Sequence, residues 1–112
     1  MDEAAFGTVA NATLERIGLA LDAALETSNA TFEWTLDDGV LTITASETPV
    51  VVRRDVAARA IVVDAGDRSV AFHAKDGRWA DERGNALGDA LVRALRSEAR
   101  ISLRRVPELP AG

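Results

Sequence analysis

The chain has 112 residues, 47% hydrophobic and 28% charged, which is the length and composition of one globular domain. It contains no cysteine, which excludes disulfides, Cys-ligated zinc or iron–sulfur clusters and a thiol nucleophile. The net charge of −5 is uneven: residues 1–47 carry nine acids against one base, and residues 48–112 carry nine acids against twelve bases. We therefore expect one acidic and one weakly basic side, no affinity for nucleic acid, and no membrane span, because the apolar runs are short.

The first predicted element is a helix from about Glu3 to Glu26. Acids at its start complement the helix dipole. Its apolar residues recur at helical spacing and predict one buried stripe. They are Phe6, Ala10, Leu14, Ile17, Leu21 and Leu25.

Strands are predicted for the middle of the chain. Residues 31–36 alternate apolar and polar, and Asp37-Asp38-Gly39 is typical of the tight turn of a hairpin whose second strand is 40–44. A third strand is expected to begin at 50–52, and the remaining strands are expected at 59–63, 69–73 and 78–80.

A second helix is predicted for 85–99, with Asn85 able to cap it. Consecutive strands joined by short turns form an antiparallel meander, and the two flanking helices must cover one of its faces. We therefore expect a two-layer α+β sandwich with five or six strands. One domain is expected over residues 1–105, followed by a flexible tail over 106–112, which is rich in proline and glycine.

No set of catalytic residues is visible. The chain has a single histidine, His73, in the middle of a predicted strand, and it has neither a nucleophile-elbow pattern nor a glycine-rich phosphate loop. We therefore expect a protein that is not an enzyme. No secretory or transit segment precedes the first helix, which favours the cytoplasm.

Carboxylates dominate one side of the first helix. Glu15, Asp22 and Glu26 form a stripe, and no base stands at the spacing that would pair with Asp22 or Glu26. Acids of the following strand and turn, Glu33 and Asp37 among them, extend this surface if the strand lies beside the helix. Such oxygens suit weak, exchangeable binding of divalent or ferric cations, whereas the alternative is a charged face that only maintains solubility.

Arginines form the counterpart. Arg53 and Arg54 end the strand that begins at 50–52, and Arg59 begins the next. A short connection is expected to bring them together on the sheet, where they would bind an acidic or peptide partner. The alternative is ordinary polar positions on a half-exposed sheet. A further reading of the low pI of about 4.8 is an acidic interaction protein without metal function, such as a secretion chaperone.

The order of these segments resembles the frataxin/CyaY family over about residues 3–99. The resemblance is carried by the acidic first helix, the strand DGVLTIT at 38–44, the β-branched strand that ends in a polar triplet at 53–55, and the element DGRW at 76–79. It implies a frataxin-like domain that is an iron-binding accessory protein of iron–sulfur cluster assembly, either an iron donor or a regulator. The implied partners are a cysteine desulfurase and the iron–sulfur scaffold protein, and the implied state is a cytoplasmic monomer.

The resemblance also implies roles for particular residues. Weak iron binding is expected at Asp22, Glu26, Glu33 and Asp37. The family's Asn-Arg-Gln triplet is Arg53-Arg54-Asp55 here, and its exposed sheet tryptophan falls at Val62. The partner-binding positions are therefore expected at Arg53, Arg54, Arg59 and Val62.

Overall fold

The computed structural model describes residues 2–27, 31–45, 48–99, 101 and 109–111. Helix α1 (Glu3–Thr27) precedes the strands, and helix α2 (Leu87–Ala94) follows them and continues into a π-helical turn, Leu95–Ala99. The strands are β1 (Glu33–Asp37), β2 (Val40–Thr44), β3 (Val50–Asp55), β4 (Ala60–Ala65), β5 (Arg68–Lys75) and β6 (Arg78–Ala80).

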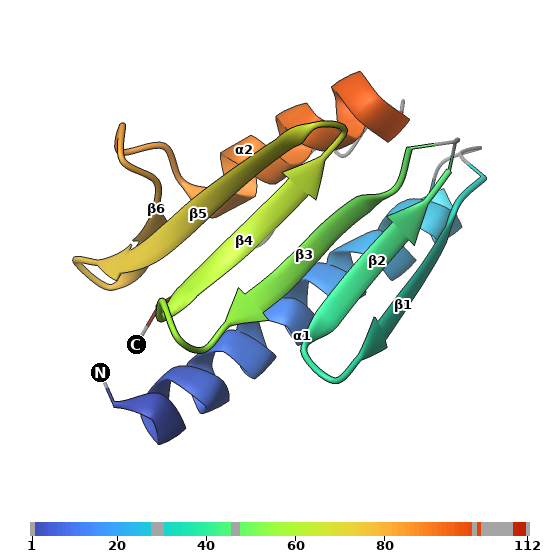
Figure 1. The fold of residues 1–112 in the computed structure, drawn as a ribbon. Helices are drawn as coiled ribbons and strands as arrows, with labels where there is room; N and C mark the ends of the chain where they lie inside the picture. Colours follow the sequence, from blue (N-terminus) through green and yellow to red (C-terminus); the bar gives the residue numbers. More distant parts are fainter. Residues whose placement is uncertain (1, 28–30, 46–47, 100, 102–108, 112) are drawn as a thin grey trace.

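The six strands form one antiparallel sheet in the order of the sequence, and both helices cover the same face of it (Figure 1). This arrangement confirms the predicted two-layer sandwich. The β1–β2 turn is also as predicted, because Asp38 and Gly39 both have positive φ angles, of 49° and 77°. The other face of the sheet carries no helix among the described residues, and we call it the open face.

The core lies between the helices and the covered face of the sheet. The predicted stripe of α1 is buried from Phe6 to Leu21, while Leu25 is half-buried at its end. Strand alternation supplies the opposite wall, with Leu41 and Ile43 of β2 and their neighbours on β3 and β4 pointing inward. Burial of these side chains is the main force that holds the helices on the sheet.

One buried polar contact joins the two layers. Thr13 of α1 is 1% exposed, and its hydroxyl donates to the Val9 carbonyl at 2.9 Å and accepts from Trp79 Nε1 at 3.0 Å. Trp79 is 1% exposed, and its ring packs edge-on against Phe6. The hydroxyl thus provides the partner that a buried indole N–H requires.

The second helix starts later than predicted. Its N-cap is Ala86, and the N-cap side chain makes no capping hydrogen bond. Asn85 is not the cap, because its side chain donates to Asp81 Oδ2 at 3.1 Å in the preceding turn. Asp81 also accepts the backbone N–H groups of Arg83 and Asn85, and these bonds, led by the one from the Asn85 side chain, hold its pKa below the ordinary value.

Part of the predicted flexible tail packs on the domain. Leu109 and Ala111 are 7% and 3% exposed and belong to the core. The Ala111 N–H donates to the Gly77 carbonyl at 2.9 Å, and Pro110 forms an antiparallel bridge with Arg78 of β6. This packing differs from the expectation for 109–111, and residues 106–108 and 112 lie outside the described residues.

Candidate functional site

The acidic stripe of α1 is exposed as predicted. Glu15, Asp22 and Glu26 all face solvent, and none of them forms an ion pair with a described residue. Asp22 and Glu26 are one helical turn apart, so their carboxylates are neighbours on the helix surface. These two carboxylates are therefore able to share a cation.

Trp34 of β1 connects this stripe to the sheet. Its Nε1–H donates to Asp22 Oδ1 at 2.9 Å. The ring lies so close to α1 that a Cβ at Gly18 would be 2.7 Å from Trp34 Cη2, and only glycine therefore admits it. The indole orients the Asp22 carboxylate and occupies one of its oxygens, which leaves Oδ2 without a hydrogen bond to any described residue.

The predicted ligands of β1 lie on the opposite side of the strand. Trp34 and Leu36 pair with the buried Ile43 and Leu41, so the alternate residues Glu33 and Asp37 point to the open face. Four residues along a strand span about 13 Å, which is too far for Glu33 and Asp37 to share one ion.

The four predicted ligands therefore do not form one site. Two of them are neighbours on the helix, and the other two stand apart from each other on β1. Within the described ranges, no three acidic or histidine side chains are grouped closely enough to hold a metal ion. The chemistry available is that of one or two surface carboxylates for each ion, which is weak and exchangeable.

Arg54 lies over the turn between β1 and β2, away from the acids predicted to bind iron. Its Nη1 donates to Asn11 Oδ1 of α1 at 2.6 Å, and its Nη2 lies 3.5 Å from Asp38 Oδ1. A Cβ at Gly39 would be 2.3 Å from Arg54 Nε, so the turn fits closely under the side chain. Arg54 thus fastens the β1–β2 turn to α1 from the covered side of the sheet.

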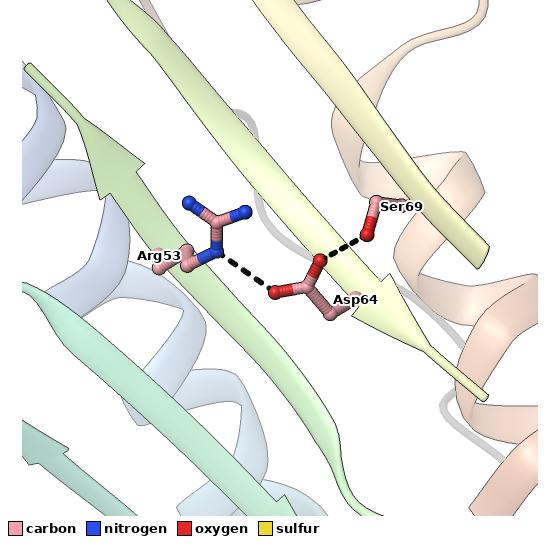
Figure 2. A network of polar contacts seen from close by, with 3 residues as sticks. All are labelled: Arg53, Asp64 and Ser69. Atoms are coloured by element: carbon pink, nitrogen blue, oxygen red, sulfur yellow. Dashed lines mark hydrogen bonds and ion pairs between the residues drawn. The ribbon is translucent and has the colours of Figure 1, made fainter. Parts of the chain in front are cut away.

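Arg53 points to the open face, where it joins strands β3, β4 and β5 (Figure 2). Its Nε donates to Asp64 Oδ2 at 2.8 Å, and the Ser69 hydroxyl donates to Asp64 Oδ1. Partial burial opposes ionisation of Asp64, but the hydrogen bonds from Arg53 and Ser69 outweigh it and hold its pKa below the ordinary value. The two terminal nitrogens of Arg53 point away from Asp64 (Figure 2).

Val62 is the direct cross-strand partner of Arg53, and Ala71 of β5 lies beyond it on the same row. Val62 is 6% exposed. The position at which the resemblance implied an exposed tryptophan is therefore occupied by a small side chain that is nearly covered. Arg53 is the charged side chain between Val40 and Val62 in this row.

Arg59 contacts neither the Arg53 group nor the Arg54 group. It lies in the turn between β3 and β4 with a positive φ of 53°, and its Nη1 donates to the Val56 carbonyl. The three arginines predicted to meet on the sheet are thus separated among the open face, the covered side and a turn.

Sequence analysis did not predict two features of these surfaces. One is the contact of Asp64 with Arg53 and Ser69, and the other is the hydrogen bond from Trp34 to Asp22. Both depend on which residues face each other across strands or between layers. Strand alternation alone places Asp64 on the same face as Val62, which was the one available signal.

Comparisons with known proteins come from a family model and from solved structures. The model of the frataxin-like domain matches residues 1–103. The solved frataxin from Psychromonas ingrahamii, described as a model to study stability modulation within the CyaY protein family, superposes with a TM-score of 0.73. It is 16% identical to this chain, and the match covers 92% of this chain and 96% of that one. Among curated proteins none matches the chain. No described helix is long and apolar enough to cross a membrane.

Proposed function

Because the chain belongs to the frataxin-like (CyaY) family, we propose that it is an iron-binding accessory protein of iron–sulfur cluster assembly, an iron donor or regulator and not an enzyme. Its partners are a cysteine desulfurase and the scaffold protein, and it acts as a monomer in the cytoplasm. The observation that carries the proposal is a set of five exposed carboxylates, on α1 and on the open face of β1, without an ion-pair partner among the described residues. They are Glu15, Asp22, Glu26, Glu33 and Asp37.

Iron is the cargo of this surface. Asp22 and Glu26 offer hard oxygen atoms one helical turn apart, which suits a ferrous or ferric ion that keeps most of its water. The bond from Trp34 fixes the orientation of the Asp22 carboxylate and so reduces the entropy lost when an ion binds. Glu33 and Asp37 bind singly and more weakly, because each stands alone on the open face of β1.

The partner contact uses the acidic surface and the open face. Unpaired carboxylates attract a basic surface of the desulfurase and raise the rate of encounter at low salt. The open face adds a flat area in which Arg53 is held by Asp64, with its terminal nitrogens free to meet an acidic group on the scaffold. Arg54 and Arg59 act indirectly, by holding the turns that border this face.

A ferrous titration under anaerobic conditions tests the iron site. Paramagnetic broadening of amide NMR signals is expected first around Asp22 and Glu26 and later around Glu33 and Asp37. The double variant Asp22→Asn/Glu26→Gln is expected to lose the early broadening around residues 22 and 26 and to keep the later broadening around residues 33 and 37.

The matched control is Asp67→Asn/Glu82→Gln, which removes two exposed charges elsewhere. It is expected to behave as the wild type does. Broadening that scatters over the surface, or that is the same in both variants, would contradict the assignment of the iron site.

A further inference from the structure

Among the residues that the structure describes, nothing covers the sheet edge at β1. This strand pairs with β2 through five residues in unbroken register, and no described residue makes a backbone hydrogen bond to its outer edge. Figure 1 shows β1 at the margin of the sheet with no element beside it. A strand edge of this kind presents a row of unpaired N–H and C=O groups that is able to bind another extended chain.

The other edge of the sheet is different. Strand β6 has three residues, and the C-terminal segment lies against it through the bridge between Arg78 and Pro110. The nearby hydrogen bond from Ala111 to Gly77 holds this segment in place. Shortness, proline and a covering segment are devices that block edge pairing. Strand β1 has no proline and no bulge, and its two acids are the charged groups that it carries.

The two faces of β1 have different chemistry. On the open face stand Glu33 and Asp37, with Thr35 between them. On the helix side stand Trp34, which is half-buried, and Leu36, which is 36% exposed. A strand added at this edge would therefore have acids beside one set of its side chains and apolar surface beside the other.

We propose that the β1 edge binds an extended segment of a protein partner as a seventh strand, with basic residues opposite Glu33 and Asp37 and apolar residues beside Trp34 and Leu36. Main-chain hydrogen bonds to β1 supply the affinity, and the alternating side chains supply the selectivity. Opposite charges directly across a strand pair are stabilising. The proposal concerns how a partner chain is held, and it stands apart from iron binding and from the identity of the partner.

Two symmetric pairings of β1 with a second copy of this chain bring like charges together. An antiparallel pair centred on Thr35 would place Glu33 of one copy opposite Asp37 of the other, and a parallel pair in register would place each acid opposite itself. Both arrangements set like charges across the pair, which is destabilising. In these two registers the acids oppose self-pairing, whereas they favour a basic strand.

The first test uses the wild-type protein and the peptide acetyl-Lys-Val-Thr-Val-Lys-amide. Binding is expected to shift the NMR signals of residues 33–37 and to protect their outward amides from hydrogen exchange. Two N-methylated forms are compared, one methylated at residues 1, 3 and 5 of the peptide and the other at residues 2 and 4. A strand presents alternate amides to its neighbour, so one form is expected to lose about tenfold or more in affinity while the other stays within about threefold.

Any other pattern overturns the proposal. If both methylated peptides bind alike, the attraction is that of side-chain charge alone. If neither binds, or if the parent peptide does not shift residues 33–37, β1 does not accept a strand.

The second test reverses the charge of β1. The variant Glu33→Lys/Asp37→Lys is expected to lose the basic peptide and to bind acetyl-Glu-Val-Thr-Val-Glu-amide instead. The control Asp67→Lys/Glu82→Lys makes the same change in net charge at exposed sites away from β1 and is expected to keep the original preference. Equal loss in both variants would overturn the proposal, because net charge would then explain the binding. None of these results depends on iron or on a desulfurase.

Discussion

The contact between Thr13 and Trp79 allows a sharp test of how the two layers are joined. The substitution Thr13→Val keeps the shape of the side chain and removes the hydroxyl that accepts the Trp79 Nε1–H at 3.0 Å. The indole N–H then remains buried without a partner, because both residues are 1% exposed. An unsatisfied buried donor costs about 1–3 kcal/mol of stability.

The matched control is Thr8→Val on the same helix. Thr8 makes the same kind of bond to the carbonyl four residues earlier, to Ala4 at 3.2 Å, but it is exposed, and its hydroxyl accepts no hydrogen bond from a described tryptophan. Thr8→Val is therefore expected to change stability by less than about 0.5 kcal/mol, as surface substitutions do.

The measurement is equilibrium unfolding in urea. For a domain of this size a loss of about 2 kcal/mol moves the midpoint down by roughly 1–2 M. The indole signal of Trp79 in the NMR spectrum should shift at the same time. If the two valine variants differ by less than about 0.5 kcal/mol, the reasoning about the buried donor is refuted.

Three further predictions follow from other contacts. Because the pKa of Asp64 is lowered in the fold, the contribution of this group to stability is present above about pH 4 and is lost as the pH falls through the lowered pKa. The stability difference between wild type and Asp64→Asn should therefore shrink in acid, and a difference independent of pH in urea unfolding would contradict the ion pair with Arg53. Gly18→Ala should displace the Trp34 ring and shift its indole NMR signal, since the added Cβ would be 2.7 Å from Cη2, and an unchanged signal would refute this close packing. Leu109→Ala should lower the free energy of unfolding by about 2 kcal/mol, because the side chain is 7% exposed, whereas a neutral result would show that this segment does not stabilise the domain.

Local patterns account for what the sequence predicted well. The stripe from Phe6 to Leu21 follows the helical period, and the Asp38-Gly39 turn follows from the positive φ that these residues tolerate. Strand β3 begins with the three valines and ends in the polar triplet at 53–55, as predicted, because the backbone ladder with β4 does not require apolar side chains.

Contacts between distant residues explain what was missed. Arg53 and Arg54 are consecutive in a strand and so point to opposite faces of the sheet. The prediction of an arginine cluster did not take this alternation into account. The same alternation separates Glu33 from Trp34 and hence from Asp22. The packing of Leu109 and Ala111 was not predictable from composition, because it depends on a hydrogen bond to Gly77 that lies more than thirty residues away.

The most direct test of the assembly role is the affinity for the purified cysteine desulfurase of the same organism, measured by biolayer interferometry at low and physiological salt. The wild type is expected to bind. The variant Asp22→Lys/Glu26→Lys/Glu33→Lys is expected to bind at least about tenfold more weakly, because charges at an interface affect both the association and the dissociation rate. A control with three reversed charges elsewhere, at Asp67, Glu82 and Asp89, is expected to stay within about threefold of the wild type. No binding by the wild type, or equal loss in both variants, would contradict the account.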